Sequence, residues 1–336
     1  MRPSPGLVLA ALVLTGCGGA IAGTAIPGPT TVSLADVAGA DAEVLDVAAT
    51  ADGRSVALLA PPGGPLTLAD VAADGTVTVV PLRGLDSERP GLTRIAADGE
   101  GVVVVGFAAG RVALVEADLR RADAPEPVGT LGAADVSALD AVVIDGVLLL
   151  ALSGIDGAHR LVAVDPESGV VRDEVALPGT PRDLHVSGDG MVVVATDTGR
   201  SASVVIVDAA LQIIGEVPTG PGAAGPLTVV DGDVYATVGG SGDVSITRGS
   251  EVLATVPGDL PALVTVDGDR ATLVDTVADG EVPRVLQRSV DLAAGEVVAE
   301  VELCDGGAVD GSDVDGSGRA SVVSDCRGEP VLWRFG

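Results

Sequence analysis

A short apolar strand, an Asp-Gly pair and a second apolar strand recur along this chain, and this repeat limits the fold more than any other feature. Asp-Gly between two alternating apolar runs is a strong β-hairpin signal, because both turn residues must accept a positive φ. Successive repeats begin 36 to 48 residues apart, a period typical of a small four-stranded sheet repeated around a ring. The seven turn aspartates are Asp52, Asp98, Asp145, Asp189, Asp231, Asp267 and Asp315.

Further strand pairs fill each repeat. In the first repeat, segments 66–71 and 76–82 flank a second Asp-Gly, whereas the last repeat holds only three strands. The apolar segment 30–37 precedes the first repeat, and we expect it to supply the missing strand, because ring closure removes an open sheet edge. The predicted fold class is all-β: a seven-bladed β-propeller of four-stranded antiparallel blades, with the last blade closed by the N-terminal strand. Six blades, eight blades or a two-sheet sandwich are the alternatives.

This layout resembles that of the WD-like and YVTN-type seven-bladed propeller superfamily over about residues 30–336. The resemblance is one of repeat spacing, because the Trp-Asp dipeptide of WD repeats is absent. It implies that loops are sorted onto two opposite faces of a disc. It also implies that a ligand site lies on the face that carries the loops between the second and third strands and the crossovers between blades.

The N-terminal residues predict export and lipid attachment. Arg2 precedes the apolar run 7–14, which is too short for a membrane span of about 20 residues. The residues Leu14-Thr15-Gly16-Cys17 resemble the lipobox of bacterial lipoproteins, which implies cleavage after Gly16 and lipidation of Cys17. We therefore expect a signal peptide at 1–16, a flexible tether at 17–31 and the propeller domain at 32–336. The alternative is an ordinary secretion signal with a chance cysteine.

The charge balance limits the partners. The chain has 19 basic residues, all arginine, against 48 acidic ones, for a net charge of −29. Such a chain is not expected to bind nucleic acid or to adsorb to anionic lipid through its surface. The lipid alone would then hold it at the extracytoplasmic face of the cell membrane. We expect a monomeric domain that needs no cofactor.

The expected sorting of loops defines a candidate binding face opposite the Asp-Gly turns. Guanidinium groups form paired hydrogen bonds with carboxylates and phosphates, so this face predicts a small anionic ligand or an envelope protein as the partner. The alternative is that its arginines offset the acidity of long loops. The residues assigned to this face are Phe107, Arg111, His159, Arg160, Arg182, Arg200, Arg284 and Arg327.

The other chemistry-bearing residues are few. Cys304 and Cys326 map to the same face and predict a disulfide in an oxidising compartment, with two buried thiols as the alternative. Asp310, Asp313 and Asp315 crowd one segment and form a weak calcium candidate, because they lack the regular spacing of calcium loops. Apart from that candidate we expect no metal site.

No nucleophile elbow or phosphate-binding loop is present in the sequence. The favoured interpretation is a membrane-anchored extracytoplasmic lipoprotein whose propeller is a binding or scaffold module. A metal-dependent, lactonase-like hydrolase that uses carboxylates in the channel is the alternative, and a purely structural envelope protein is a third. Enzymatic activity is the less favoured reading, and the sequence identifies no catalytic residue.

Overall fold

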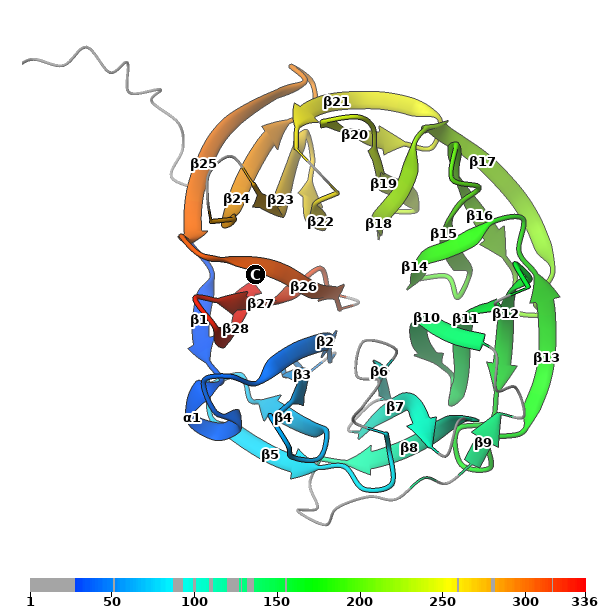
Figure 1. Cartoon of the computed structure of the whole chain (residues 1–336). Helices are drawn as coiled ribbons and strands as arrows, with labels where there is room; N and C mark the ends of the chain where they lie inside the picture. Colours follow the sequence, from blue (N-terminus) through cyan, green and yellow to red (C-terminus); the bar gives the residue numbers. More distant parts are fainter. Residues whose placement is uncertain are drawn as a thin grey trace, which may run out of the picture.

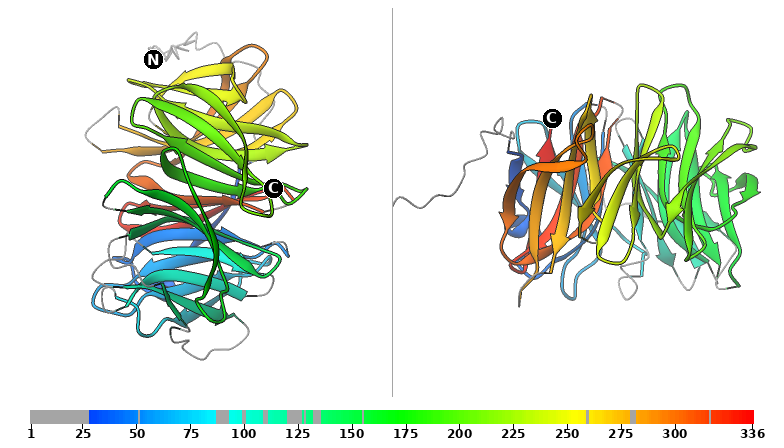
Figure 2. Two further views of the ribbon diagram at one scale, coloured as in Figure 1. Left: turned by 90° about the vertical axis from the view of Figure 1, so that its right-hand side faces the viewer. Right: turned by 90° about the horizontal axis from the view of Figure 1, so that it is seen from above.

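The repeats form seven four-stranded antiparallel blades arranged around a central channel (Figure 1), which confirms the predicted fold class. Seen from the side, the molecule is a disc with the strands running between its two broad faces (Figure 2). The computed structural model describes residues 28–50, 52–86, 93–98, 101–108, 111–119, 127, 129–131, 136–154, 156–258, 260–278, 282–315 and 317–336. The predicted signal peptide, most of the tether and Cys17 lie outside these residues.

The blades follow the order of the chain. Blade 1 contains β2 (Glu43–Ala49), β3 (Ser55–Ala60), β4 (Thr67–Val71) and β5 (Val77–Pro81). Blade 2 contains β6 (Arg94–Asp98), β7 (Gly101–Ala108), β8 (Arg111–Asp118) and β9 (Gly129–Leu131). Blade 3 contains β10 (Val136–Ile144), β11 (Val147–Gly154), β12 (His159–Val164) and β13 (Val171–Ala176). Blade 4 contains β14 (Thr180–Val186), β15 (Val192–Asp197), β16 (Ser201–Val207) and β17 (Ile213–Pro221).

The remaining blades complete the ring. Blade 5 contains β18 (Ala223–Val230), β19 (Asp233–Gly239), β20 (Asp243–Arg248) and β21 (Glu251–Pro257). Blade 6 contains β22 (Ala262–Asp267), β23 (Arg270–Val277), β24 (Arg284–Asp291) and β25 (Glu296–Cys304). Blade 7 contains β26 (Gly307–Val314), β27 (Ala320–Cys326), β28 (Glu329–Phe335) and β1 (Thr30–Ser33). The last blade is therefore closed by the N-terminal strand, as predicted.

The closing strand is shorter than the expected segment 30–37. Strand β1 pairs with β28, with Thr31 opposite Trp333, and ends at Ser33. Helix α1 (Ala35–Ala38) follows, because the carbonyl of Leu34 accepts the N–H of Ala38 at 3.0 Å and turns the chain. The side chain of Leu34 is fully buried and holds this corner against the sheet. Pairing also starts at Thr30, two residues before the expected domain boundary.

The seven turn aspartates of the repeat all belong to the hairpin between the first and second strands of a blade. Asp145 and Asp231 adopt φ values of 50° and 52°, and the glycines that follow them have φ values of 70° and 84°. These are the left-handed conformations that a two-residue hairpin turn requires. Because every blade has the same strand order, the seven turns share one face, here called the lower face. The opposite, upper face carries the loops between second and third strands and the crossovers between blades.

The core is divided among the blade interfaces. Each hydrophobic cluster combines side chains from two neighbouring blades, such as Leu149 of blade 3 with Val194 of blade 4. The cluster at the ring closure joins Val44 of blade 1 to Leu332 of blade 7. Valine, leucine and alanine fill these interfaces, and burying each large aliphatic side chain contributes about 1.5–3 kcal/mol. Ring stability therefore depends on contacts between blades as much as on those within them.

The predicted disulfide is present between the sixth blade and the closing blade. Cys304, the last residue of β25, is bonded to Cys326, the last residue of β27, with a Cα–Cα distance of 5.9 Å. It therefore links blade 6 covalently to blade 7. In the part of the chain that the structure covers, no helix is long and apolar enough to cross a membrane.

Candidate binding site in the central channel

Three innermost strands carry an aspartate at the same structural position. Asp46 in β2, Asp140 in β10 and Asp183 in β14 each directly follow a register shift in the pairing with the second strand of their blade. A bulge of this kind bends the strand and re-aims the side chain that follows it. The three carboxylates, here called the waist aspartates, line the channel together.

Backbone donors from the next blade hold several channel carboxylates in place. Oδ2 of Asp46 accepts the N–H of Ile95 at 3.0 Å, and Oδ2 of Asp183 accepts the N–H of Leu227 at 2.8 Å. Lower in the channel, Oδ2 of Asp313 accepts the N–H of Ala49 at 2.7 Å. These aspartates therefore join neighbouring blades as well as facing the channel.

Asp140 has a different environment. Its Oδ1 accepts the N–H of its own neighbour Ala141 at 2.8 Å. Among the residues that the structure describes, no backbone N–H from blade 4 reaches it. Asp140 is thus the waist aspartate whose carboxylate is least committed to holding the ring together.

Burial raises the pKa of these carboxyl groups, because the charged form loses water in the channel. It raises the pKa of Asp183 and of Asp313 to about 7 and also raises that of Asp46, although backbone N–H donors pull each of these values down. The pKa of Asp140 rises well above its usual range, since the charges of Asp183 and Asp46 add to the loss of solvation. At neutral pH the channel therefore holds carboxyl groups that take up protons readily.

The channel has an upper and a lower space, and the waist aspartates lie at the junction between them. The lower chamber, about 740 Å³, is also lined by His185, Ser187 and Asp313. The upper mouth, about 280 Å³, is also lined by Arg94 and Arg182. All three waist aspartates line both spaces, so they lie at the level where the mouth opens into the chamber.

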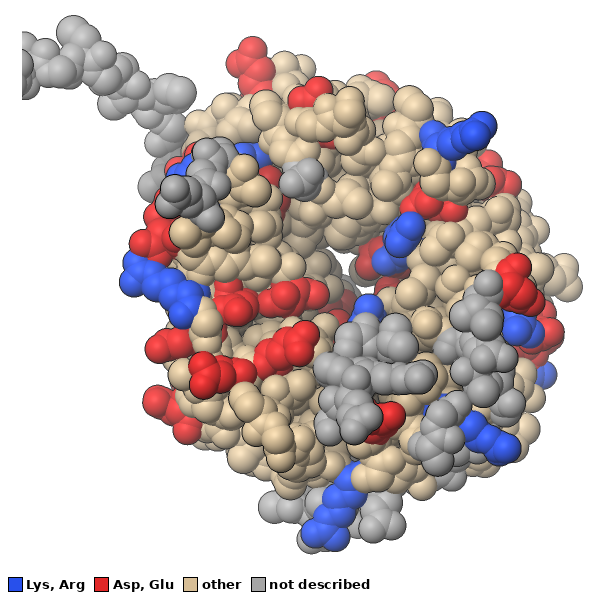
Figure 3. Space-filling view, viewed as in Figure 1, with Lys and Arg blue, Asp and Glu red and all other residues tan. Residues whose placement is uncertain are grey.

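Two arginines border the upper mouth. Nε of Arg94 donates to the carbonyl of Leu139 at 2.9 Å, and the positive charge of Arg94 lowers the pKa of both Asp46 and Asp140. Nε of Arg182 donates to Asp197 at 2.7 Å, while 47% of the Arg182 side chain stays exposed. Figure 3 shows basic side chains beside the central opening and acidic ones gathered over the junction of blades 7 and 1. The upper face is therefore of mixed charge.

The structure corrects one residue of the predicted binding face. Phe107 lies in β7 with only 2% of its surface exposed, because it packs into the core between blades 2 and 3. His159 is half-buried at the start of β12, where its ring nitrogens lie 3.1 Å from Ser153 Oγ and 3.3 Å from Thr180 Oγ1. The ring therefore connects blade 3 to blade 4 and does not line the channel.

The predicted arginines do not gather at the channel, and of these only Arg182 lines the upper mouth. Arg111 is exposed in blade 2, and Arg200 is exposed in blade 4, in the loop between β15 and β16. The other three pair with carboxylates of nearby strands or loops. This agrees with the alternative considered from the sequence, in which the arginines offset local acidity. These pairs are Arg160 with Glu174, Arg284 with Glu302, and Arg327 with Asp305.

The three aspartates of the weak calcium candidate, Asp310, Asp313 and Asp315, have different partners and do not form one site. Asp310 accepts the N–H of Asp325 at 2.8 Å, and burial raises its pKa to about 6. Asp313 faces the lower chamber, and Asp315 pairs with Arg319 at 2.8 Å. Within the described part of the chain, no three His, Cys, Asp or Glu side chains are placed to hold a metal ion.

Sequence reasoning missed Arg94 and the waist aspartates. A signal was present, since Asp46, Asp140 and Asp183 each stand five or six residues before the turn aspartate of their repeat. An ionisable residue inside an otherwise apolar inner strand is unusual enough to mark a channel position. It was hidden by the abundance of aspartates in turns.

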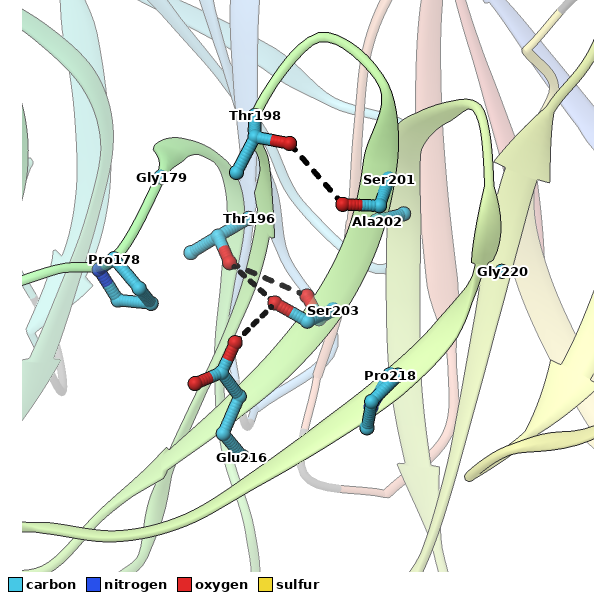
Figure 4. Close-up of a pocket in the computed structure, with 10 residues that line it drawn as sticks. All are labelled: Pro178, Gly179, Thr196, Thr198, Ser201, Ala202, Ser203, Glu216, Pro218 and Gly220. Atoms are coloured by element: carbon cyan, nitrogen blue, oxygen red, sulfur yellow. Dashed lines mark hydrogen bonds between the residues drawn. The ribbon is translucent and has the colours of Figure 1, made fainter.

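A second, smaller pocket lies on the flank of blade 4 (Figure 4). Its volume is about 210 Å³, and Pro178 and Pro218 form part of its wall. Ser203 Oγ lies 3.1 Å from Thr196 Oγ1 and donates to Glu216 at 3.1 Å. The polar groups shown there bond to one another, so the pocket offers fewer recognition groups than the channel.

Comparison with known proteins identifies the fold. No family model matches the chain, and no curated protein matches it. Among solved structures, it is similar to Kuenenia stuttgartiensis hydrazine synthase, with TM-score 0.62, 16% identity, and 95% of this chain and 99% of that one covered. It is also similar to the Neurospora crassa Pan2 WD40 domain, with TM-score 0.61, 14% identity, and 92% of this chain and 95% of that one covered. Its similarity to Staphylococcus aureus virginiamycin B lyase has TM-score 0.60 and 12% identity, with 91% of this chain and 98% of that one covered. At these identities the likeness is one of architecture, and the chain is a seven-bladed β-propeller with neighbours of diverse function.

Proposed function

We propose that this chain is an extracytoplasmic lipoprotein and that its propeller is a binding module that receives a ligand or partner at the upper mouth of the channel. The observation that carries the binding role is the convergence of Arg94 and Arg182 with the waist aspartates around one opening. Concave sites with a few convergent charged groups are the usual places of ligand recognition. The lipid anchor is supported by the residues around Cys17.

Two features favour a binding module over the hydrolase alternative. Asp46, Asp183 and Asp313 already accept backbone N–H groups of neighbouring blades, so moving them toward a metal would loosen the ring. In the described residues, moreover, no three His, Cys, Asp or Glu side chains lie close enough together to hold a metal ion. A lactonase-like mechanism needs such a set of ligands in the channel.

The binding role is tested by quantitative affinity capture from envelope extracts with the full-length chain. The double variant Arg94→Ala/Arg182→Ala is compared with Arg172→Ala. Arg172 lies on the outer strand β13 and forms an exposed ion pair with Asp165, in the turn before that strand. We expect bound material to be lost from the mouth variant and kept by the control. Equal capture by both variants would contradict a site at the mouth.

The anchor is tested separately by metabolic labelling with palmitate and by phase partition in detergent. The unaltered chain should incorporate label and enter the detergent phase, whereas Cys17→Ser should do neither. Labelling that survives in Cys17→Ser would show that the lipid is attached elsewhere.

A further inference from the structure

We propose that the upper mouth binds a small zwitterion, an amino acid or ω-amino acid, with its carboxylate on Arg182 and its ammonium group among the waist aspartates. This inference deepens the proposed binding function and rests on it. It follows from the charges around the channel. Arg94, Arg182 and Asp310 line the mouth but not the chamber, whereas the waist aspartates line both and therefore lie at the base of the mouth.

The space suits a small ligand. The mouth measures about 280 Å³ and opens at its base into the chamber of about 740 Å³. The mouth volume lies near the lower end of ordinary ligand pockets, at roughly 300 Å³. Pro226, Leu260 and Pro261 form an apolar part of the wall, against which the methylene groups of an ω-amino acid can pack.

Arg182 supplies the anion-binding group. Asp197 engages its Nε from one side, and this contact orients the guanidinium plane while nearly half of the side chain remains exposed at the mouth. The terminal nitrogens of an arginine oriented in this way can donate two parallel hydrogen bonds to a carboxylate. Arg94 strengthens the positive potential at the same opening.

Asp140 is the best-placed partner for the ammonium group. It lines both the mouth and the chamber, and its hydrogen bond with the N–H of Ala141 uses Oδ1 alone. An ammonium group at this level would offset the mutual repulsion of Asp140, Asp183 and Asp46, since opposite charges favour each other strongly where water is scarce.

Ligands with a single charge fit this arrangement less well. A simple carboxylate bound to Arg182 would lie close to the waist aspartates and be repelled by them. A simple amine that enters from the upper face must pass Arg94 and Arg182. A zwitterion satisfies both sets of groups at once, because its two charges are separated in the same order as those of the protein.

The test is calorimetric titration of the full-length chain in detergent at pH 8. The zwitterionic probes are glycine, 4-aminobutyrate and 6-aminohexanoate, which vary the separation between charges. Butyrate and butylamine are the matched probes with one charge each. We expect at least one zwitterion to bind about tenfold more tightly than either single-charge probe. Equal affinity for the single-charge probes, or no binding of any zwitterion, would overturn the proposal.

Variants assign the two ends of the ligand. Arg182→Ala and Asp140→Asn should each weaken binding of the best zwitterion by about tenfold or more, while Arg172→Ala leaves it unchanged. Arg182→Lys keeps the charge but loses the paired hydrogen bonds, so it should give an intermediate affinity. Unchanged melting temperatures show that these variants are folded. Unchanged zwitterion affinity in folded Arg182→Ala and Asp140→Asn would overturn the assignment.

The two proposals fail in different ways. If the mouth variant loses captured material but no zwitterion binds, the mouth is a binding site for another class of partner and only this inference is wrong. If capture is also unaffected by the mouth variant, the proposed function fails with it.

Discussion

Oδ2 of Asp183 in blade 4 accepts the backbone N–H of Leu227 in blade 5 at 2.8 Å. This contact brings a carboxylate into the wall of the channel, where burial raises its pKa to about 7. The same side chain therefore stabilises the ring through its hydrogen bond and destabilises it when it is charged. Four predictions about stability follow from this and related contacts.

Replacing Asp183 by Asn should raise the melting temperature at pH 8. The amide keeps an oxygen that can accept the N–H of Leu227, but it carries no charge that must be desolvated. A gain of about 1 kcal/mol corresponds to roughly 1–2 °C in a chain of this size, because the entropy of unfolding grows with chain length. At pH 5 the gain should disappear, because Asp183 is then protonated. The control is Asp165→Asn, which removes an exposed ion pair and should give no gain. An unchanged melting temperature of Asp183→Asn at pH 8 would count against the argument.

The whole chain should become more stable as the pH falls from 8 toward 5. The folded pKa of Asp183 and of Asp313 is about 7 and that of Asp310 about 6, all above the value of 3.8 expected when unfolded. At pH values between the unfolded and the folded pKa, the folded state binds more protons than the unfolded state. The free energy of unfolding therefore rises as the pH falls, and this gain in stability is lost as the pH rises through 7.

Other groups set the lower limit of this window. Burial lowers the pKa of His185, so this ring opposes folding as the pH falls below its usual value. The contacts of Asp197 and Asp315 hold the pKa of each carboxyl group below 3.8, so their stabilising effect is lost only as the pH falls below that value. We therefore expect maximum stability near pH 5 in thermal denaturation followed by circular dichroism. The double variant Asp183→Asn/Asp313→Asn should flatten the rise, and a maximum at pH 8 would refute the prediction.

Removing Arg288 should be among the most damaging single changes. Its Nη1 lies 2.9 Å from Asp275 and its Nε 3.0 Å from Glu300, and both Arg288 and Asp275 are buried. Arg288→Ala takes the arginine away from a buried carboxylate, which typically costs about 3–5 kcal/mol. Arg172→Ala, whose partner Asp165 is exposed to water, should cost less than about 1 kcal/mol in the same urea titration. Similar costs for the two variants would contradict this view.

The disulfide should contribute measurably to the free energy of unfolding. It closes a loop with a sequence separation of 22 residues, for which the chain-entropy model gives about 3 kcal/mol. We expect the double variant Cys304→Ser/Cys326→Ser to unfold at lower urea concentration, as followed by the fluorescence of Trp333, the one tryptophan of the chain. A reductant should shift the unaltered chain but not the variant. If the reductant has no effect on the unaltered chain, the bond does not stabilise it.

The blades could be predicted because their signal is local. Asp145-Gly146 and Asp231-Gly232 encode their turns through their own backbone preferences, and no distant contact is needed to recognise them. Closure by the N-terminal strand could also be predicted, since the last repeat lacked one strand. The end of β1 at Ser33 could not be predicted, because it depends on the burial of Leu34 against blades 1 and 7.

The site was harder to predict, because it depends on where the strands slip in register. A bulge before Asp46 or Asp140 is a property of paired strands and leaves no fixed mark in either strand alone. Phe107 was wrongly predicted to lie in a loop because of the residues around it in the sequence. In the structure, strand β7 continues through Phe107 to Ala108. Aspartates in inner strands, five or six residues before the turn aspartate, were the one usable sign.

The pairing of β1 with β28 makes the two ends of the described chain mutually dependent. Every blade before the seventh can be assembled from consecutive residues, but blade 7 cannot be completed until its C-terminal strand has been made. Premature termination within the last repeat would therefore leave the N-terminal strand without a neighbour and the circle open. Synthesis of β28 is in this way a condition for closing the ring.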